Sequence, residues 1–203
     1  MYQPQRYKKD DLAFQFNFIN DHPFATVVIQ GNHLLATHIP ILTKGAADNF
    51  TLFGHIANHN PMLPFLKDNL EMLLIFKGVD TYVSSSWYEE PDISTWDYSA
   101  VHVRAQIQLQ NKDELTESLE KLIRKFEKDK QHPLYKEDIP ASIWEENFPH
   151  ITGFWLKPIE ITGVSKWHQH FSDTDKDNIV SGLKNTLACP HISEHFKKKS
   201  HDS

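Results

Sequence analysis

The central stretch of the chain is Thr81-Tyr-Val-Ser-Ser-Ser-Trp-Tyr-Glu-Glu-Pro-Asp-Ile-Ser-Thr-Trp-Asp-Tyr-Ser-Ala-Val-His-Val-Arg104. It opens as a strand and closes as a strand, and a polar loop with adjacent serines, two tryptophans and a proline lies between them. Hydroxyls and planar aromatic rings together suit a ligand that is flat at one end and anionic at the other. The alternative is that Trp87 and Trp96 only pack beneath a loop.

Composition limits the class of protein around this stretch. The chain has 203 residues and 39% hydrophobic content, which suits a globular protein with a core of its own. The net charge of -6 argues against a broad nucleic-acid surface but leaves a local basic patch open. The lone Cys189 cannot form an intrachain disulfide. No signal-peptide core is visible, and the longest apolar run, Met72–Phe76, is far too short to span a bilayer, so we expect a cytoplasmic protein.

Outward from the centre, hydrophobic periodicity and turn residues predict the remaining elements. Strands are expected over residues 24–30, 33–39, 50–56, 71–77, about 98–109 and 151–164, the last interrupted by Pro158. Helices are expected from Asp10 or Asp11 to Asn20, from an Asn60 cap to Leu66, from Asn111 or Asp113 through the apolar stripe 115–126, over 140–147, and from Ser172 to about Leu187. Residues 44–49 are expected to form a turn.

The order of these elements predicts a mainly β (α+β) protein. Gly31-Asn32 joins two strands rich in β-branched residues and indicates a tight hairpin. Hairpin-like spacing with helices at the periphery favours an antiparallel barrel. We expect one domain over residues 1–190, with a helical extension over about 165–190 and a flexible basic tail over 191–203.

Several kinds of chemistry find no support in the sequence. No Gly-rich phosphate loop and no GxSxG nucleophile motif occur, and no base lies close in sequence to the serines at 84–86. His168 with His170, or His191 with His195, could share a metal, although unligated histidines explain these pairs more simply. Three other histidines lie near the ends of predicted strands, where a histidine is either a core residue or a donor into a pocket; they are His38, His55 and His102.

Three segments therefore emerge as possible walls of one site: residues 36–40, residues 54–61 and the central loop. The second segment joins a strand end to the predicted helix start, where free N–H groups favour an anion. Hydroxyl and amide side chains in the other two suit a phosphate, and the aromatic rings suit a planar group.

At these residues the sequence resembles the PaiB family, the FMN-binding "negative transcriptional regulators". The resemblance rests on Ala-Thr-His-Ile-Pro at 36–40, Gly-His-Ile-Ala-x-x-Asn-Pro at 54–61, Tyr-Val-Ser-x-Ser-Trp-Tyr at 82–88 and Thr-Trp-Asp-Tyr-x-Ala-Val-His-Val at 95–103. It extends from Met1 to Leu183 and implies an antiparallel split β-barrel of the pyridoxamine-phosphate-oxidase-like type. It also implies FMN as the cofactor, held at the interface of a homodimer.

By motif position, the resemblance implies that ten residues contact the flavin. They are Thr37, His38, His55, Ala57, Asn58, Asn60, Tyr82, Ser84, Ser86 and Trp87. Trp96 and His102 are weaker candidates. The chain departs from the family where a Lys is common and Asn58 stands here, where a Pro is common and Ser85 stands here, and where Lys-Leu-Ser-Gln-Asn becomes Lys166-Trp-His-Gln-His170.

Three functions remain open at this point. The first is an FMN-binding protein, with flavin-dependent redox activity on an unknown small molecule as an extension; no catalytic residue is assignable. The second is a regulator of transcription, as the family name says, although the residues show no helix-turn-helix pattern and the only dense basic cluster is Lys197–Lys199. The third is a haem or metal binder that uses the histidines. No membrane association is expected.

Overall fold

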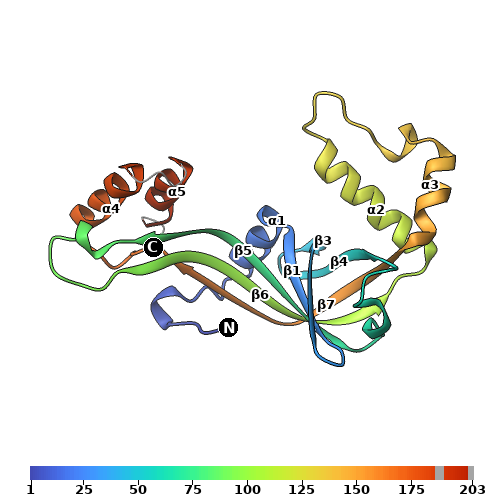
Figure 1. Cartoon of the computed structure of the whole chain (residues 1–203), viewed down its shortest axis with the longest axis horizontal. Coiled ribbons are helices and arrows are strands. Elements are labelled where there is room, and N and C mark those ends of the chain that lie inside the picture. Colours follow the sequence, from blue (N-terminus) through green and yellow to red (C-terminus); the bar gives the residue numbers. More distant parts are fainter. Residues whose placement is uncertain (186–189, 201–203) are drawn as a thin grey trace. The chain divides into compact units, whose positions relative to one another are not determined.

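The structure is a computed structural model that describes residues 1–185 and 190–200 (Figure 1). Within these residues, seven strands form one sheet in the order β2-β1-β5-β6-β7-β4-β3. The strands are β1 Phe24–Gln30, β2 Leu34–Pro40, β3 Leu42–Ala46, β4 Asn49–Ala57, β5 Glu71–Val83, β6 Thr95–Leu109 and β7 Ile151–Lys166. The helices are α1 Leu12–Asp21, α2 Lys112–Glu127, α3 Ala141–Asn147, α4 Asp173–Asn185 and α5 Pro190–Ser200. The short 3₁₀ turns are η1 Gln5–Tyr7, η2 Leu63–Phe65, η3 Ser85–Trp87, η4 Lys136–Asp138 and η5 Phe148–His150.

The chain divides into two compact units. The first unit consists of Met1–Asp10, Lys77–Val101 and Thr162–Ser203. The second unit consists of Asp11–Phe76 and His102–Ile161. Strands β5, β6 and β7 each contribute residues to both units.

In the second unit, local sequence signals set the elements as predicted. The Asp11 carboxylate accepts a hydrogen bond from the Phe14 amide at 2.6 Å and caps α1. Asn111 and Glu114 form a full capping box at the start of α2. Strands β1 and β2 pair antiparallel with Gln30 opposite Leu34, which confirms the predicted hairpin.

A close approach between β2 and β4 helps to close this unit into a barrel. A Cβ atom built on Gly54 would lie 2.6 Å from Ile41 Cδ1 and 3.1 Å from the Pro40 carbonyl oxygen. Only glycine allows the two backbones to meet at this distance. The close approach brings residues 36–40 next to β4, whose end begins the second predicted segment, residues 54–61.

Four predictions differ from the structure. Residues 44–46, expected in a turn, belong to β3, because residues 42–46 pair with β4 as its edge partner. Pro158 does not interrupt β7, which is continuous to Lys166. The helix expected after Asn60 is a turn followed by the three-residue η2. Residues 191–200, expected as part of a flexible tail, belong to α5.

In the first unit, α4 and α5 pack on an apolar cluster formed by Val83, Trp167, Ile179, Val180, Leu183 and Phe196. The Trp87 ring lies against this cluster and against Gly182 of α4, where an added Cβ would come within 2.4 Å of the indole. The expected end of α4 at Leu187, and the residues Cys189 and 201–203, lie outside the described residues. Among the described helices, none has the length and apolar character needed to cross a membrane.

Candidate functional site

Thr37 and His38 lie next to each other on β2 but face opposite sides of the sheet. Thr37 pairs with the fully buried Val27 and so shares the core-facing side. His38 pairs with Thr26, and its Nδ1 lies 3.0 Å from the Thr26 hydroxyl. The ring of Phe24 stacks beside His38 with centroids 6.2 Å apart. Strand β2 is an edge strand with no buried residue, so one face presents the threonine and the other presents the histidine.

His55 and Ala57 lie near the end of β4. The side of Gly54 that would carry a Cβ faces Ile39 and Ile41, so the His55 ring projects from the opposite side of β4. Burial lowers the pKa of His55, so its ring is neutral at neutral pH. Within the described residues, the side chains of Thr37 and His55 make no hydrogen bond. They are therefore open to a ligand as neutral polar groups.

Asn58 and Asn60 are already committed to the turn that follows β4. The Asn58 amide donates to the Pro149 carbonyl at 2.8 Å and accepts from the Thr152 hydroxyl at 2.6 Å. The Asn60 side chain accepts from the Met62 amide at 2.9 Å. The backbone amides of both asparagines donate within the protein as well, to His150 and Ala57. The turn is therefore held by internal bonds instead of offering the helix N-terminus that the sequence predicts.

The predicted residues of the central loop all lie in the first unit. Ser84 caps η3, with its hydroxyl 2.8 Å from that of Ser86. Tyr82 is exposed and meets Trp96 edge-on at 6.0 Å. Tyr82, Ser84, Trp87 and Trp96 line a cavity of about 430 Å³ together with Asp80, Thr81 and Ile192. This cavity combines aromatic rings with a hydroxyl, as the sequence predicts for the loop.

The weaker candidate His102 lies on β6 in the second unit, and burial lowers its pKa. The structure thus joins the first two predicted segments at Pro40 and Gly54 and gathers the central-loop residues around one cavity. We call residues 36–40 and 54–57 the β2–β4 wall. The assignment of all ten residues to a flavin stays a prediction.

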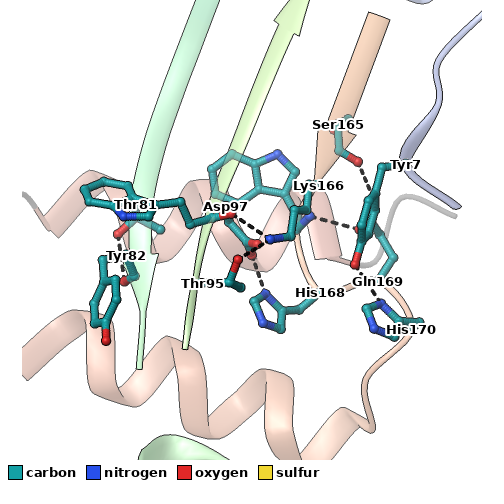
Figure 2. Close-up of polar contacts among 12 residues, drawn as sticks. Tyr7, Thr81, Tyr82, Thr95, Asp97, Ser165, Lys166, His168, Gln169 and His170 are labelled. Atoms are coloured by element: carbon teal, nitrogen blue, oxygen red, sulfur yellow. Dashed lines mark hydrogen bonds and ion pairs between the residues drawn. The ribbon is translucent and has the colours of Figure 1, made fainter. Parts of the chain in front are cut away.

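The first unit also contains a polar cluster, buried at Asp97 and His168, that the sequence did not predict (Figure 2). The Lys166 ammonium donates to the Thr95 hydroxyl and, at 2.9 Å, to the Trp96 carbonyl. Asp97 is fully buried, and its Oδ2 lies 2.5 Å from His168 Nδ1. Burial raises the pKa of Asp97 and lowers that of Lys166. The sequence offered two signals for this cluster, Asp97 within its motif and the His168–His170 pair. Neither signal links Asp97 to His168, because the two residues lie 71 positions apart in the chain.

The donor set of the β2–β4 wall fits the phosphate and carbonyl groups of a flavin through hydrogen bonds. Thr37 offers a hydroxyl, and the rings of His38 and His55 each have a nitrogen that lacks a bond in the described part of the chain. None of the ten predicted residues is a lysine or arginine. The predicted residues would therefore bind the flavin phosphate through neutral hydrogen-bond donors, without the lysine or arginine that often pairs with a phosphate.

Comparison with known proteins places these features in context. Residues 1–161 match the family model described as "Putative FMN-binding domain". The protease synthase and sporulation protein PAI 2 of Bacillus subtilis is 32% identical over 187 residues, which cover 91% of this chain and 90% of that protein.

Two solved structures share the fold at low sequence identity. The FAD and heme binding protein from Mycobacterium smegmatis superposes with a TM-score of 0.59 at 14% identity, covering 87% of this chain and 80% of that one. Flavocytochrome Anf3 from Azotobacter vinelandii gives a TM-score of 0.58 at 13% identity, covering 82% of this chain and 72% of that one. These likenesses confirm the predicted split-barrel fold.

Proposed function

Because the chain belongs to the PaiB-like family of FMN-binding domains, we propose that it is a flavoprotein that holds FMN against the β2–β4 wall. The family match agrees with the predicted cofactor, FMN. The observation that carries the proposal is the close approach of Pro40 to Gly54 within the matched residues. This approach brings together the two motifs that the resemblance assigns to the flavin.

Each residue of the wall has a specific role in this proposal. Thr37 and His55 would donate hydrogen bonds to the flavin, with His55 neutral because burial lowers its pKa, whereas His38 faces the opposite side of β2 from Thr37 and its assignment stays a prediction of the resemblance. Ala57 leaves room beside the ring of His55, while Asn58 and Asn60 fix the turn. The resemblance also assigns Tyr82, Ser84, Ser86 and Trp87 of the first unit to the flavin, and that assignment stays a prediction. When bound, the flavin supplies the capacity for hydride or electron transfer.

We also propose that the working form is a homodimer. Strand β2 is an edge of the sheet, and Leu34 on it and Phe24 on the neighbouring β1 are 71% and 67% exposed. An open edge with exposed apolar side chains favours association with a second chain. Sedimentation of the protein with and without FMN tests this: a monomer that binds FMN at full stoichiometry would contradict the dimer proposal alone.

The central experiment is a titration of the purified protein with FMN, followed by flavin fluorescence and by the melting temperature. We expect quenched fluorescence and a raised melting temperature. Thr37→Val keeps the shape of the side chain but removes its hydroxyl, and we expect about a fivefold loss of affinity. The matched control is Thr174→Val, an exposed position on α4, which should bind like the wild type. Unchanged fluorescence and melting temperature in the wild type would refute FMN binding.

A regulatory role is the second candidate, and α5 is the feature that favours it. Lys197 and Lys198 are exposed in the last turn of this helix, so the basic cluster is presented on a defined element. Retention on promoter DNA that falls with salt and is lost in Lys197→Glu/Lys198→Glu would support direct contact. Reduction of the bound flavin by a nicotinamide donor would instead favour an oxidoreductase. Salt-independent retention would remove the case for DNA contact through α5.

A further inference from the structure

The second unit contains a cavity of about 590 Å³ that uses none of the residues assigned to the flavin. All the residues that line it belong to this unit. Residues 49–51 at the start of β4 line the cavity, whereas residues 54–57 at the end of the same strand belong to the β2–β4 wall. Small-molecule sites in proteins have volumes of about 300–1,000 Å³. The cavity is therefore a separate candidate site of suitable size.

The floor of the cavity is a face of the sheet on which an apolar row borders a polar row. The apolar row is buried and crosses β3, β4 and β7 at Leu42, Phe53 and Trp155. Side chains two residues apart on a strand share a face. The next row on this face therefore consists of Lys44, Thr51 and Lys157, and all three line the cavity. We call these three residues the polar row.

The polar row carries more hydrogen-bond donors than the protein uses. The Lys44 ammonium donates to Glu117 at 3.1 Å and lies 4.9 Å from the centre of the Trp155 ring. Glu117 also accepts from Lys121 at 2.7 Å, so one carboxylate is shared by two lysines. Within the described residues, neither the Lys157 ammonium nor the Thr51 hydroxyl forms an ion pair or a hydrogen bond. These two donors therefore remain available to a ligand in the cavity.

The two acidic residues of the lining leave the charge of Lys157 unpaired. Both oxygens of Glu114 already accept hydrogen bonds, from the Trp155 indole at 3.0 Å and from the Asn111 backbone amide at 2.9 Å. Asp48 is exposed in the turn between β3 and β4, and it forms no ion pair in the part of the chain that the structure describes. Lysine donors without a protein partner favour an anion.

The opposite side of the cavity is apolar and is held in place by α1. It consists of Leu12, Phe50, Pro158 and Ile161. The Phe50 ring meets the Phe16 ring of α1 edge-on at 5.2 Å, which fixes its position. Leu12 is 49% exposed, so part of this apolar surface faces solvent. A ligand with an apolar body and a negative end would cover this surface and bond to the polar row.

We propose that this cavity binds a small organic carboxylate with an apolar body. The carboxylate would accept hydrogen bonds from Lys157, Thr51 and Lys44, and the body would lie against Phe50 and Leu12. A neutral ligand of the same shape would lose the charge-assisted bonds, and an ammonium would be repelled by both lysines. The site goes beyond the proposed flavin function, and the two can be tested separately because they share no residue.

The experiment titrates the isotope-labelled full chain with benzoate at pH 7, where an ordinary carboxyl group is ionised. Nuclear magnetic resonance follows the indole N–H signals of the tryptophans, and Trp155→Phe identifies the Trp155 signal by its loss. We expect a saturable shift of this signal, with an affinity that falls as salt screens the lysines. Benzamide has the same shape without the charge and should bind at least about fivefold more weakly. Benzylamine should bind more weakly still.

Three of these results would overturn the proposal. They are a Trp155 signal that benzoate does not shift, an equal affinity for benzamide, and a higher affinity for benzylamine. The last result would mean that Asp48 and Glu114, rather than the lysines, select the ligand.

A lysine variant tests whether the polar row reads the negative charge. Lys157→Gln removes the charge at an exposed position, and we expect about a fivefold loss of benzoate affinity with an unchanged melting temperature. The matched control is Lys67→Gln, because this lysine is also exposed but does not line the cavity. Equal benzoate affinity in Lys157→Gln and the wild type would overturn the proposal.

A competition experiment separates this site from the flavin site. Saturating FMN should leave the benzoate affinity unchanged, and Lys157→Gln should bind FMN as the wild type does. Displacement of benzoate by FMN would show that the two ligands share a site and would overturn the inference. A protein that binds benzoate at Trp155 but binds no FMN would instead contradict the flavin proposal alone.

Discussion

The first unit buries one ionisable pair, whereas the β2–β4 wall of the second unit carries its polar groups at or near the surface. Asp97 and His168 have side-chain exposures of 0% and 3% and are paired with each other. His38 is exposed on an edge strand, and His55 makes no side-chain hydrogen bond among the described residues. The buried groups need fixed partners because an unpaired charge in the interior is costly. The polar groups of the wall need no fixed partner, so they stay available for a ligand.

The two regions should differ most in the stability lost when one partner of the buried Asp97–His168 pair is removed. Asp97→Ala leaves the Nδ1–H of His168 unpaired in the interior and opens a cavity, and we expect a loss of about 3 kcal/mol in the free energy of unfolding. Asp97→Asn retains an acceptor oxygen and should lose about 1 kcal/mol. His38→Ala in the wall should change stability by less than about 0.5 kcal/mol. Urea unfolding measures all three, and equal losses in Asp97→Ala and His38→Ala would remove the distinction between the two regions.

The same contrast explains what could be predicted from the sequence. Strand β1, the hairpin and the start of α2 at Asn111 depend on residues within a few positions of one another, and each was predicted. Strand β3 has a weak pattern of its own and exists because β4 pairs with it. The Asp97–His168 bond joins residues 71 positions apart and has no local signal. The resemblance to a family supplied the barrel and the cofactor, whereas the contacts of Asn58 and Asn60 required the structure.

A second, smaller effect is expected where β2 meets β4. Gly54→Ala places a methyl group 2.6 Å from Ile41 Cδ1 and 3.1 Å from the Pro40 carbonyl oxygen. The side chain can move but the carbonyl cannot move freely, so we expect a loss of about 2 kcal/mol by urea unfolding. FMN affinity should fall as well, because the wall opens. Ala36→Ser at an exposed position of β2 is the control and should leave both quantities unchanged. A fully stable Gly54→Ala would show that the close approach is not required.

Asn58 provides a sharper test of what belongs to the wall. Its side chain bonds to Pro149 and Thr152, so Asn58→Ala should cost about 1 kcal/mol in the free energy of unfolding. If the asparagine serves only the turn, FMN affinity measured by fluorescence should stay within about twofold of the wild type. A tenfold loss of affinity with an intact melting temperature would instead place Asn58 at the flavin, as its motif position implies.

The smallest expected effect is the pH dependence that His55 gives to stability. Burial lowers the pKa of His55 in the folded protein, so the unfolded chain takes up a proton at a higher pH than the folded one. The neutral ring therefore contributes stability above the ordinary histidine pKa of about 6.5, and this contribution is lost as the pH falls through that value and on to the lowered one. His55→Gln removes the proton uptake, so its free energy of unfolding should decline less steeply than that of the wild type between about pH 7 and pH 5. His33→Gln, at an exposed turn, should retain the wild-type slope.

Bound FMN should steepen the wild-type slope if His55 must stay neutral to donate to it, whereas a flatter slope with FMN would mean that the phosphate draws a proton onto the ring. The sign of that change would therefore show whether the wall holds the flavin with neutral donors, as its composition indicates, or supplies a charge only when the ligand is present.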